Sequence, residues 1–136
     1  MPSTWQVLPP GGAVALITAA LDDQIPATVV AAFLSSFVDS LCGVPHCLCN
    51  AVPDVLTWFE MADIAAMIAP RGLIIEAGRQ DPIFPIGATE ATYAELVDVW
   101  QGLGAEQPDL VITDAGHQFR ADEAIALLQR QLRATP

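Results

Sequence analysis

Two side chains that could carry acid–base chemistry follow apolar runs of the sequence. Asp81 comes three residues after the run GLIIEAG (72–78), and His117 comes three residues after the run DLVITD (109–114). A carboxylate that orients a histidine and stabilises its cation is the acid–base part of a hydrolase triad. The alternative is that the two loop residues are merely structural or solvated, which is common for such residues taken singly.

The elements that must position this pair read as alternating strands and helices. Apolar runs with β-branched residues predict buried strands at 27–33, 72–78 and 109–114. Alternation with helices predicts an α/β fold with a parallel sheet and right-handed crossovers. The carboxyl ends of such strands lie at one edge, so Asp81 and His117 can meet there. The helices are expected at 13–21, in two pieces within 53–70, at 87–104 and at 121–134.

Several motifs together resemble a known group of enzymes. GLIIEAGRQDPIFPIGAT followed by AGHQF is similar to the end of α/β-hydrolases of the dienelactone hydrolase and acetyl xylan esterase-like group. The segments HCLCNAVPDVL, EMADIAAMIAPR and AVALITAALDDQIPATVVAAF also resemble that group, so the likeness covers roughly residues 8–133. The resemblance implies Asp81 as the triad acid, His117 as the general base, a small ester as substrate and no cofactor.

The residues before the first expected helix depart from that group. A GxSxGG-like nucleophile elbow should precede AVALITAAL, but this chain reads VLPPGGAVAL. Pro9 has no nucleophilic atom, and Pro10 lacks the backbone N–H that normally helps to form the oxyanion hole. We therefore expect a truncated α/β-hydrolase of three parallel strands with flanking helices. Residues 1–12 are expected to form an irregular arm and 13–136 the domain.

Other residues could supply a nucleophile to the pair. Three serines follow the first expected strand, and two cysteines lie in the irregular stretch after them next to His46. A hydroxyl needs a histidine within hydrogen-bond reach, and a reactive thiolate needs an electropositive setting. Two cysteines and one histidine lack a fourth zinc ligand, so no metal is predicted. The candidate nucleophiles are Ser36, Ser35, Ser40, Cys47 and Cys49.

Four other side chains are expected to support the fold. Glu76 lies within an apolar strand and should be a buried acid that is structural or supports the site. Aromatic side chains at such positions more often belong to the core than to a substrate platform. On that basis we expect Trp58, Phe59 and Trp100 in the core.

Composition limits the partners. The net charge is −11, with five arginines and no lysine, so the chain lacks the clustered cations that nucleic acid or an anionic membrane requires. No apolar run reaches the roughly 18 residues of a membrane span, and the first residues do not resemble a signal peptide. Three cysteines form no even disulfide framework, so a cytoplasmic location is expected.

The resemblance also implies earlier strands that this sequence does not contain, and without them strand 27–33 would be an apolar sheet edge, which invites pairing with another chain. The apolar helix 13–21 would also need cover, so we expect a homo-oligomer. Three functions stay open: an ester hydrolase with a non-standard nucleophile, a catalytically inactive fragment that folds by self-association, and a regulatory partner of a full-length hydrolase.

Overall fold

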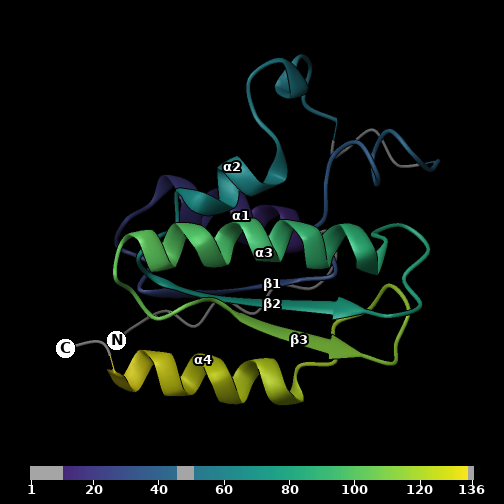
Figure 1. The fold of residues 1–136 in the computed structure, drawn as a ribbon. Helices are drawn as coiled ribbons and strands as arrows, with labels where there is room; N and C mark the ends of the chain where they lie inside the picture. The colour runs from purple at the N-terminus through teal and green to yellow at the C-terminus, as the bar shows by residue number, and fades with distance from the viewer. Residues whose placement is uncertain (1–10, 46–50, 135–136) are drawn as a thin grey trace.

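A computed structural model describes residues 11–45 and 51–134 as a layered α/β unit (Figure 1). Three helices cover one face of a three-stranded sheet and one helix covers the other. The predicted fold class is confirmed. The elements in chain order are α1 (Gly11–Leu21), β1 (Ala27–Ala31), the short 3₁₀ turn η2 (Val55–Thr57), α2 (Met61–Ala66), β2 (Gly72–Gly78), α3 (Ile86–Gly102), β3 (Asp109–Thr113) and α4 (Asp122–Ala134).

The sheet has the order β1-β2-β3, and both pairs of strands are parallel. Glu76 of β2 lies opposite Ala31 of β1 and Val111 of β3. All three strands therefore end at the same edge, where the loops that carry Asp81 and His117 begin. Within the described residues, β1 and β3 form the two outer edges of the sheet.

Two apolar cores lie on opposite faces of the sheet because side chains alternate along each strand. Leu73 and Ile75 point into the larger core with α1, α2 and α3. Ile74 points into the smaller core, where Ala124 and Leu128 of α4 pack. β2 is thus covered on both faces, as its unbroken apolar sequence predicted.

Several element bounds differ from those expected. α1 begins at Gly11 rather than residue 13, so the last two residues of the expected arm are helical. β1 ends at Ala31 rather than residue 33, because Ala32 has a φ of 49°, which is incompatible with an extended strand. The elements α3, α4, β2 and β3 begin and end within two residues of their expected bounds, whereas α2 ends at Ala66, four residues before the end of the expected range 53–70.

The expected core position is wrong for two of the three aromatic side chains. Trp58 is 75% exposed and Phe59 is 52% exposed, because both lie in the segment around η2 that projects from the rest of the chain (Figure 1). Trp100 is buried as predicted, and its indole N–H donates to the Arg71 carbonyl at 3.1 Å.

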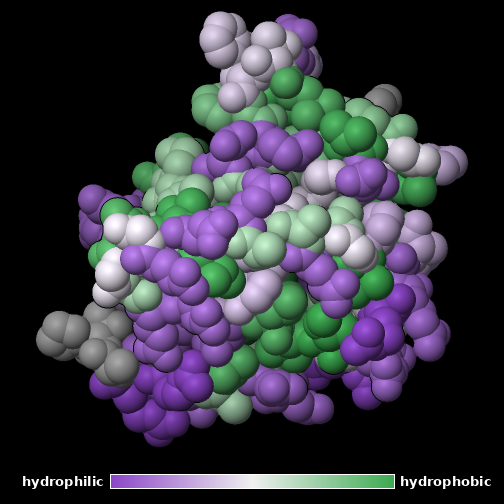
Figure 2. Space-filling model, viewed as in Figure 1, coloured by the Kyte–Doolittle hydropathy of each residue, from purple (hydrophilic) through white to green (hydrophobic). Residues whose placement is uncertain are grey.

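The surface is mixed rather than uniformly polar. Figure 2 shows hydrophilic side chains over α4 and a hydrophobic area between α3 and α4, above β3. No helix among residues 11–45 and 51–134 is long and apolar enough to cross a membrane.

Candidate acid–histidine site

Asp81 lies in the loop that follows β2, and its side chain is only 1% exposed. One carboxylate oxygen, Oδ1, accepts hydrogen bonds from the backbone N–H groups of Ile83 at 2.8 Å and Phe84 at 3.1 Å. This is the local turn that an aspartate before a proline favours, since Pro82 restricts the backbone and donates no bond of its own. The turn fixes the carboxylate and leaves Oδ2 free to point elsewhere.

His117 lies in the loop that follows β3, and its Nδ1 atom is 3.0 Å from Asp81 Oδ2. An ionised carboxylate only accepts, so the pair requires a proton on Nδ1 and leaves Nε2 of the neutral ring as an acceptor. The His117 side chain is 30% exposed, whereas its partner is buried. The predicted contact between the two residues is confirmed, and the arrangement can move a proton at Nε2.

The imidazole also has an apolar neighbour. The ring of Phe84 stacks on that of His117, with centroids 5.6 Å apart and planes inclined by 24°. Phe33, just beyond β1, packs against Phe84 at a centroid distance of 5.2 Å. The residues after all three strands therefore contribute to one cluster around the histidine.

The loops after β2 and β3 continue side by side beyond the strands. The N–H of Arg79 donates to the Thr113 carbonyl at 2.8 Å, and that of Gln80 donates to the Ala115 carbonyl at 2.9 Å. Gly78 makes this approach possible, because a Cβ atom there would be 2.3 Å from the Gly116 carbonyl oxygen. A side chain at position 78 would therefore push the loop that carries His117 (residues 114–121, the histidine loop) away from Asp81.

The loop after β1 holds the three candidate serines, and none of the hydrogen bonds found among the described residues joins them to His117. Ser36 Oγ donates to Asp39 at 2.6 Å, and Ser40 Oγ donates to the Ser36 carbonyl, so these hydroxyls support their own turn. Ser35 is fully buried and its Oγ has no partner. None of these three serines is therefore placed as a nucleophile by its contacts.

Known proteins resemble this chain in sequence and in fold, although no family model matches it. It is 31% identical over 132 residues to YtaP of Bacillus subtilis (strain 168), which is named as a candidate hydrolase. That alignment covers 90% of this chain and 43% of YtaP.

Two solved structures have the same arrangement of strands and helices. A family 15 carbohydrate esterase from Caldicellulosiruptor kristjansonii, named a glucuronoyl esterase, matches with a TM-score of 0.71 at 20% identity. The match covers 92% of this chain and 42% of the esterase chain. A protein from Klebsiella pneumoniae subsp. pneumoniae MGH 78578, named as a candidate dienelactone hydrolase, matches with a TM-score of 0.50 at 20% identity. In that case the match covers 93% of this chain and 49% of the other.

This chain carries part of an α/β-hydrolase fold. It spans less than half the length of the proteins it matches. The resemblance that its motifs indicated is thereby confirmed at the level of the fold.

Some of the predicted site residues lie outside the part that the structure describes. These are the candidate thiols Cys47 and Cys49, their neighbour His46, and the prolines at 9 and 10 that replace the elbow. Within residues 11–45 and 51–134, no group of three histidine, cysteine, aspartate or glutamate side chains could hold a metal ion.

Sequence reasoning missed two supports of the acid–histidine site. Thr89 and Thr92 of α3 are buried and donate to the carbonyls of Leu34 at 2.7 Å and Ser35 at 2.8 Å. They tie the helix after Asp81 to the loop after β1. A pair of threonines three residues apart on an amphipathic helix was the available indication, because a buried hydroxyl needs a partner.

Proposed function

We propose that this chain hydrolyses small carboxylic esters, with His117 as the general base and Asp81 as the residue that orients it. The observation that carries the proposal is the 3.0 Å contact between a buried carboxylate and a half-exposed imidazole at the carboxyl edge of a parallel sheet. That edge is where open α/β sheets place their functional groups.

The chemistry follows from the free ring nitrogen. Nε2 of His117 takes a proton from an attacking O–H group as its oxygen bonds to the ester carbonyl carbon, and the carbonyl π electrons move to oxygen. The Asp81 carboxylate stabilises the resulting imidazolium through Nδ1–H. When the tetrahedral intermediate collapses, the C–O bond to the alcohol breaks and Nε2–H returns the proton to the leaving oxygen. The products are one acid and one alcohol.

We propose water as the attacking group. Ser36 and Ser40 hydroxyls are engaged within their own turn, and the Ser35 hydroxyl is buried without a contact to the histidine. The His117 side chain is 30% exposed, so solvent reaches part of the imidazole, and we propose that this part includes Nε2. A water molecule therefore needs no rearrangement of the chain to reach the base.

The substrate class is an ester of a small acyl group. The resemblance to the dienelactone hydrolase group and the fold shared with a glucuronoyl esterase both favour carboxylic esters. The ring of Phe84 beside His117 supplies an apolar wall for the acyl part. A panel for the assay should therefore contain short activated acyl esters, a lactone and a glucuronoyl ester.

The experiment is a comparison of purified proteins on that panel. We expect hydrolysis by the unaltered chain and a loss of about 10²–10⁴-fold in kcat/KM for His117→Ala and Asp81→Ala, the range for a general base and its partner. Asp114→Asn is the matched control, because this carboxylate lies in the same loop as His117 but is exposed and pairs with Arg79 at 3.4 Å.

Equal rates in all four proteins would contradict the catalytic role of the pair. Labelling with serine- and cysteine-directed inactivators, followed by mass analysis, then tests the attacking group. A covalent adduct on a serine or cysteine that abolishes activity would contradict attack by water while leaving the pair in place.

We also propose that the chain associates with a second copy of itself through α1 and the neighbouring edge strand β1. Val14, Ile17 and Leu21 recur along one side of α1 and are exposed, while Leu16 on the other side is buried. A helix that is apolar all round is normally covered. Because α1 has no charged residue in a chain of net charge −11, two copies meet there at the least electrostatic cost.

Sedimentation tests this association directly. At micromolar concentration we expect a dimer or larger species, and Ile17→Glu should shift it to the monomer because it buries a charge at the contact. Leu103→Glu is the control, since Leu103 is also an exposed apolar side chain, 59% against 41% for Ile17, but follows α3. A monodisperse monomer for the unaltered chain would refute self-association, and co-purification with a longer hydrolase would favour a regulatory partner instead.

A further inference from the structure

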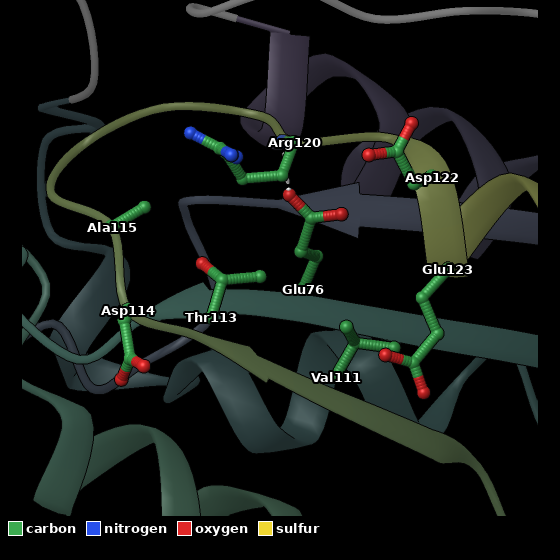
Figure 3. A pocket seen from close by; sticks show the side chains of 8 residues that line it. All are labelled: Glu76, Val111, Thr113, Asp114, Ala115, Arg120, Asp122 and Glu123. Atoms are coloured by element: carbon green, nitrogen blue, oxygen red, sulfur yellow. Dashed lines mark hydrogen bonds between the residues drawn. The ribbon is translucent and has the colours of Figure 1, made fainter.

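Glu76 is a buried carboxylate in the central strand, and its exposed fraction is 2%. Its side chain emerges on the face of β2 that packs against α4 and points toward the loop between β3 and α4 (Figure 3). The other side chains of β2 that have a Cβ atom are all apolar. A carboxylate in such a place needs donors close by.

The donors come from the end of the loop that carries His117. The Glu76 carboxylate accepts from the backbone N–H of Arg120 at 2.5 Å and from that of Ala121 at 3.2 Å. Ala121 has a φ of 69°, the left-handed region that alanine rarely adopts. The two bonds therefore stabilise a strained turn that leads from the histidine loop into α4.

The histidine loop is thus tied to β2 at both ends. At its start, the Ala115 carbonyl accepts from Gln80 N–H at 2.9 Å, next to Asp81. At its end, Glu76 holds the amides of Arg120 and Ala121. His117 lies between these two ties, and Asp81, the acid that it contacts, lies in the loop that follows the same strand.

We propose that Glu76 is a positioning residue for His117: its carboxylate holds the end of the loop so that the imidazole stays within hydrogen-bond distance of Asp81. The inference rests on the proposed ester hydrolysis for its functional meaning, but the positioning itself is a structural property. Glu76 touches neither the substrate nor the reacting atoms; it acts through the backbone of Arg120 and Ala121.

The charges around Glu76 favour this role over a simple ion pair. Arg120, Asp114, Asp122 and Glu123 line a pocket of about 290 Å³ beside it (Figure 3). Arg120 hydrogen-bonds to Glu76 through its backbone N–H, and its charge lowers the pKa of Glu76, whereas the charge of Asp122 raises it. Burial raises the pKa of Glu76 even though both amide bonds lower it. The ionised form of the carboxylate is therefore destabilised by its burial. It binds the two backbone N–H groups at the end of the histidine loop.

The test compares Glu76→Gln with Glu60→Gln. A glutamine at position 76 keeps the shape of the side chain but offers one acceptor oxygen, and its NH₂ group faces the second amide. Glu60 is the control because its carboxylate also accepts from two backbone amides, Phe37 at 2.5 Å and Met61 at 2.8 Å, but through the single oxygen Oε1 and away from the histidine loop. Glu76→Gln should lose stability, whereas Glu60→Gln can keep both of its bonds on the remaining oxygen.

The readouts separate positioning from general stability. The proton on His117 Nδ1 gives a low-field NMR signal when it is held by Asp81, and His117→Ala assigns it. In Glu76→Gln we expect this signal to weaken or vanish and kcat to fall roughly 10- to 100-fold with KM little changed, as for a base displaced by about 1 Å. In Glu60→Gln the signal and kcat should be retained.

The outcomes also separate this inference from the proposed function. Loss of the signal in Glu76→Gln without any ester hydrolysis by the unaltered chain would support positioning and remove the hydrolase proposal. Hydrolysis with signal and kcat unchanged in Glu76→Gln would overturn positioning and leave the hydrolase proposal intact. An equal loss of signal in both variants would also overturn positioning.

A second measurement covers the case in which Glu76→Gln does not fold. In the unaltered protein, the amide proton shifts of Arg120 and Ala121 should follow the ionisation of Glu76. The His117 signal should then change with the same midpoint. Amides that titrate while the His117 signal stays constant through that midpoint would overturn the proposal.

Discussion

Gly78→Ala should separate the acid from the histidine without touching either side chain. Gly78 is the last residue of β2, where the chain turns toward Asp81. A Cβ atom there would lie 2.3 Å from the Gly116 carbonyl oxygen and 2.5 Å from that of Ala115. Both obstacles are backbone atoms of the histidine loop, so neither can swing aside as a flexible side chain would.

The required displacement sets the size of the effect. Ordinary contact begins near 3.4 Å, so the histidine loop must retreat by roughly 1 Å. His117 follows Gly116 directly, and its 3.0 Å bond to Asp81 would then exceed hydrogen-bond length. A misplacement of about 1 Å can cost on the order of 10²-fold in rate. Overpacking of this kind should also reduce the free energy of unfolding by about 1–3 kcal/mol.

The assay is ester hydrolysis together with urea unfolding, and Gly87→Ala is the matched control. Gly87 lies in α3, and a Cβ atom there would meet nothing within 4 Å. That control should keep its rate and gain about 0.5–1 kcal/mol from the higher helix propensity of alanine. A Gly78→Ala protein that retains both the low-field His117 signal and the unaltered kcat/KM would refute the reasoning.

Three further changes test other parts of the site. Burial raises the pKa of Glu76 above 4.5, so folding favours the uncharged side chain. The stability that this side chain contributes is therefore fully present below pH 4.5, and it is lost as the pH rises through the raised pKa. The difference in unfolding free energy between the unaltered protein and Glu76→Gln should therefore fall with pH in urea titrations, and a constant difference would contradict this. Ser35→Ala should raise the free energy of unfolding by about 1 kcal/mol or more, since its Oγ is buried without a hydrogen-bond partner among the described residues. It should leave ester hydrolysis unchanged, and a loss of activity would identify Ser35 as the attacking group instead. Thr89→Val should lower stability by about 1–3 kcal/mol in thermal unfolding, because the Leu34 carbonyl loses its 2.7 Å donor, and an unchanged melting temperature would show that this tie is dispensable.

Local patterns were enough to predict the sheet and the acid–histidine pair. The three strands are short apolar runs between helical segments, and parallel connection brings their carboxyl ends to one edge regardless of detail. Asp81 follows β2 by three residues and His117 follows β3 by four, so topology alone brings them close. The turn that fixes Asp81 is local as well, since the DPIF sequence itself provides both donors.

The residues that hold Asp81 and His117 in place do so through contacts between positions that are far apart in the sequence. The spacing of apolar residues does not reveal such contacts. Thr89 bonds to a carbonyl 55 positions earlier in the chain, and Glu76 to amides 44 and 45 positions later. Ala32 and Ala121 have positive φ angles, in the left-handed region of the backbone. An alanine in the sequence does not predict this conformation, whereas a glycine or asparagine would have done so. Trp58 and Phe59 were assigned to the core by residue type, but the short η2 turn carries them away from it.

The most direct test of the central claim is a double-mutant cycle on Asp81 and His117, because residues that act as one unit are strongly non-additive. The kcat/KM for a short activated ester is measured for the unaltered chain, Asp81→Asn, His117→Ala and the double variant. If the 3.0 Å pair is the acid–base unit of the reaction, the double variant loses no more activity than His117→Ala alone. Independent losses that multiply in the double variant, or no loss in either single variant, would contradict the claim.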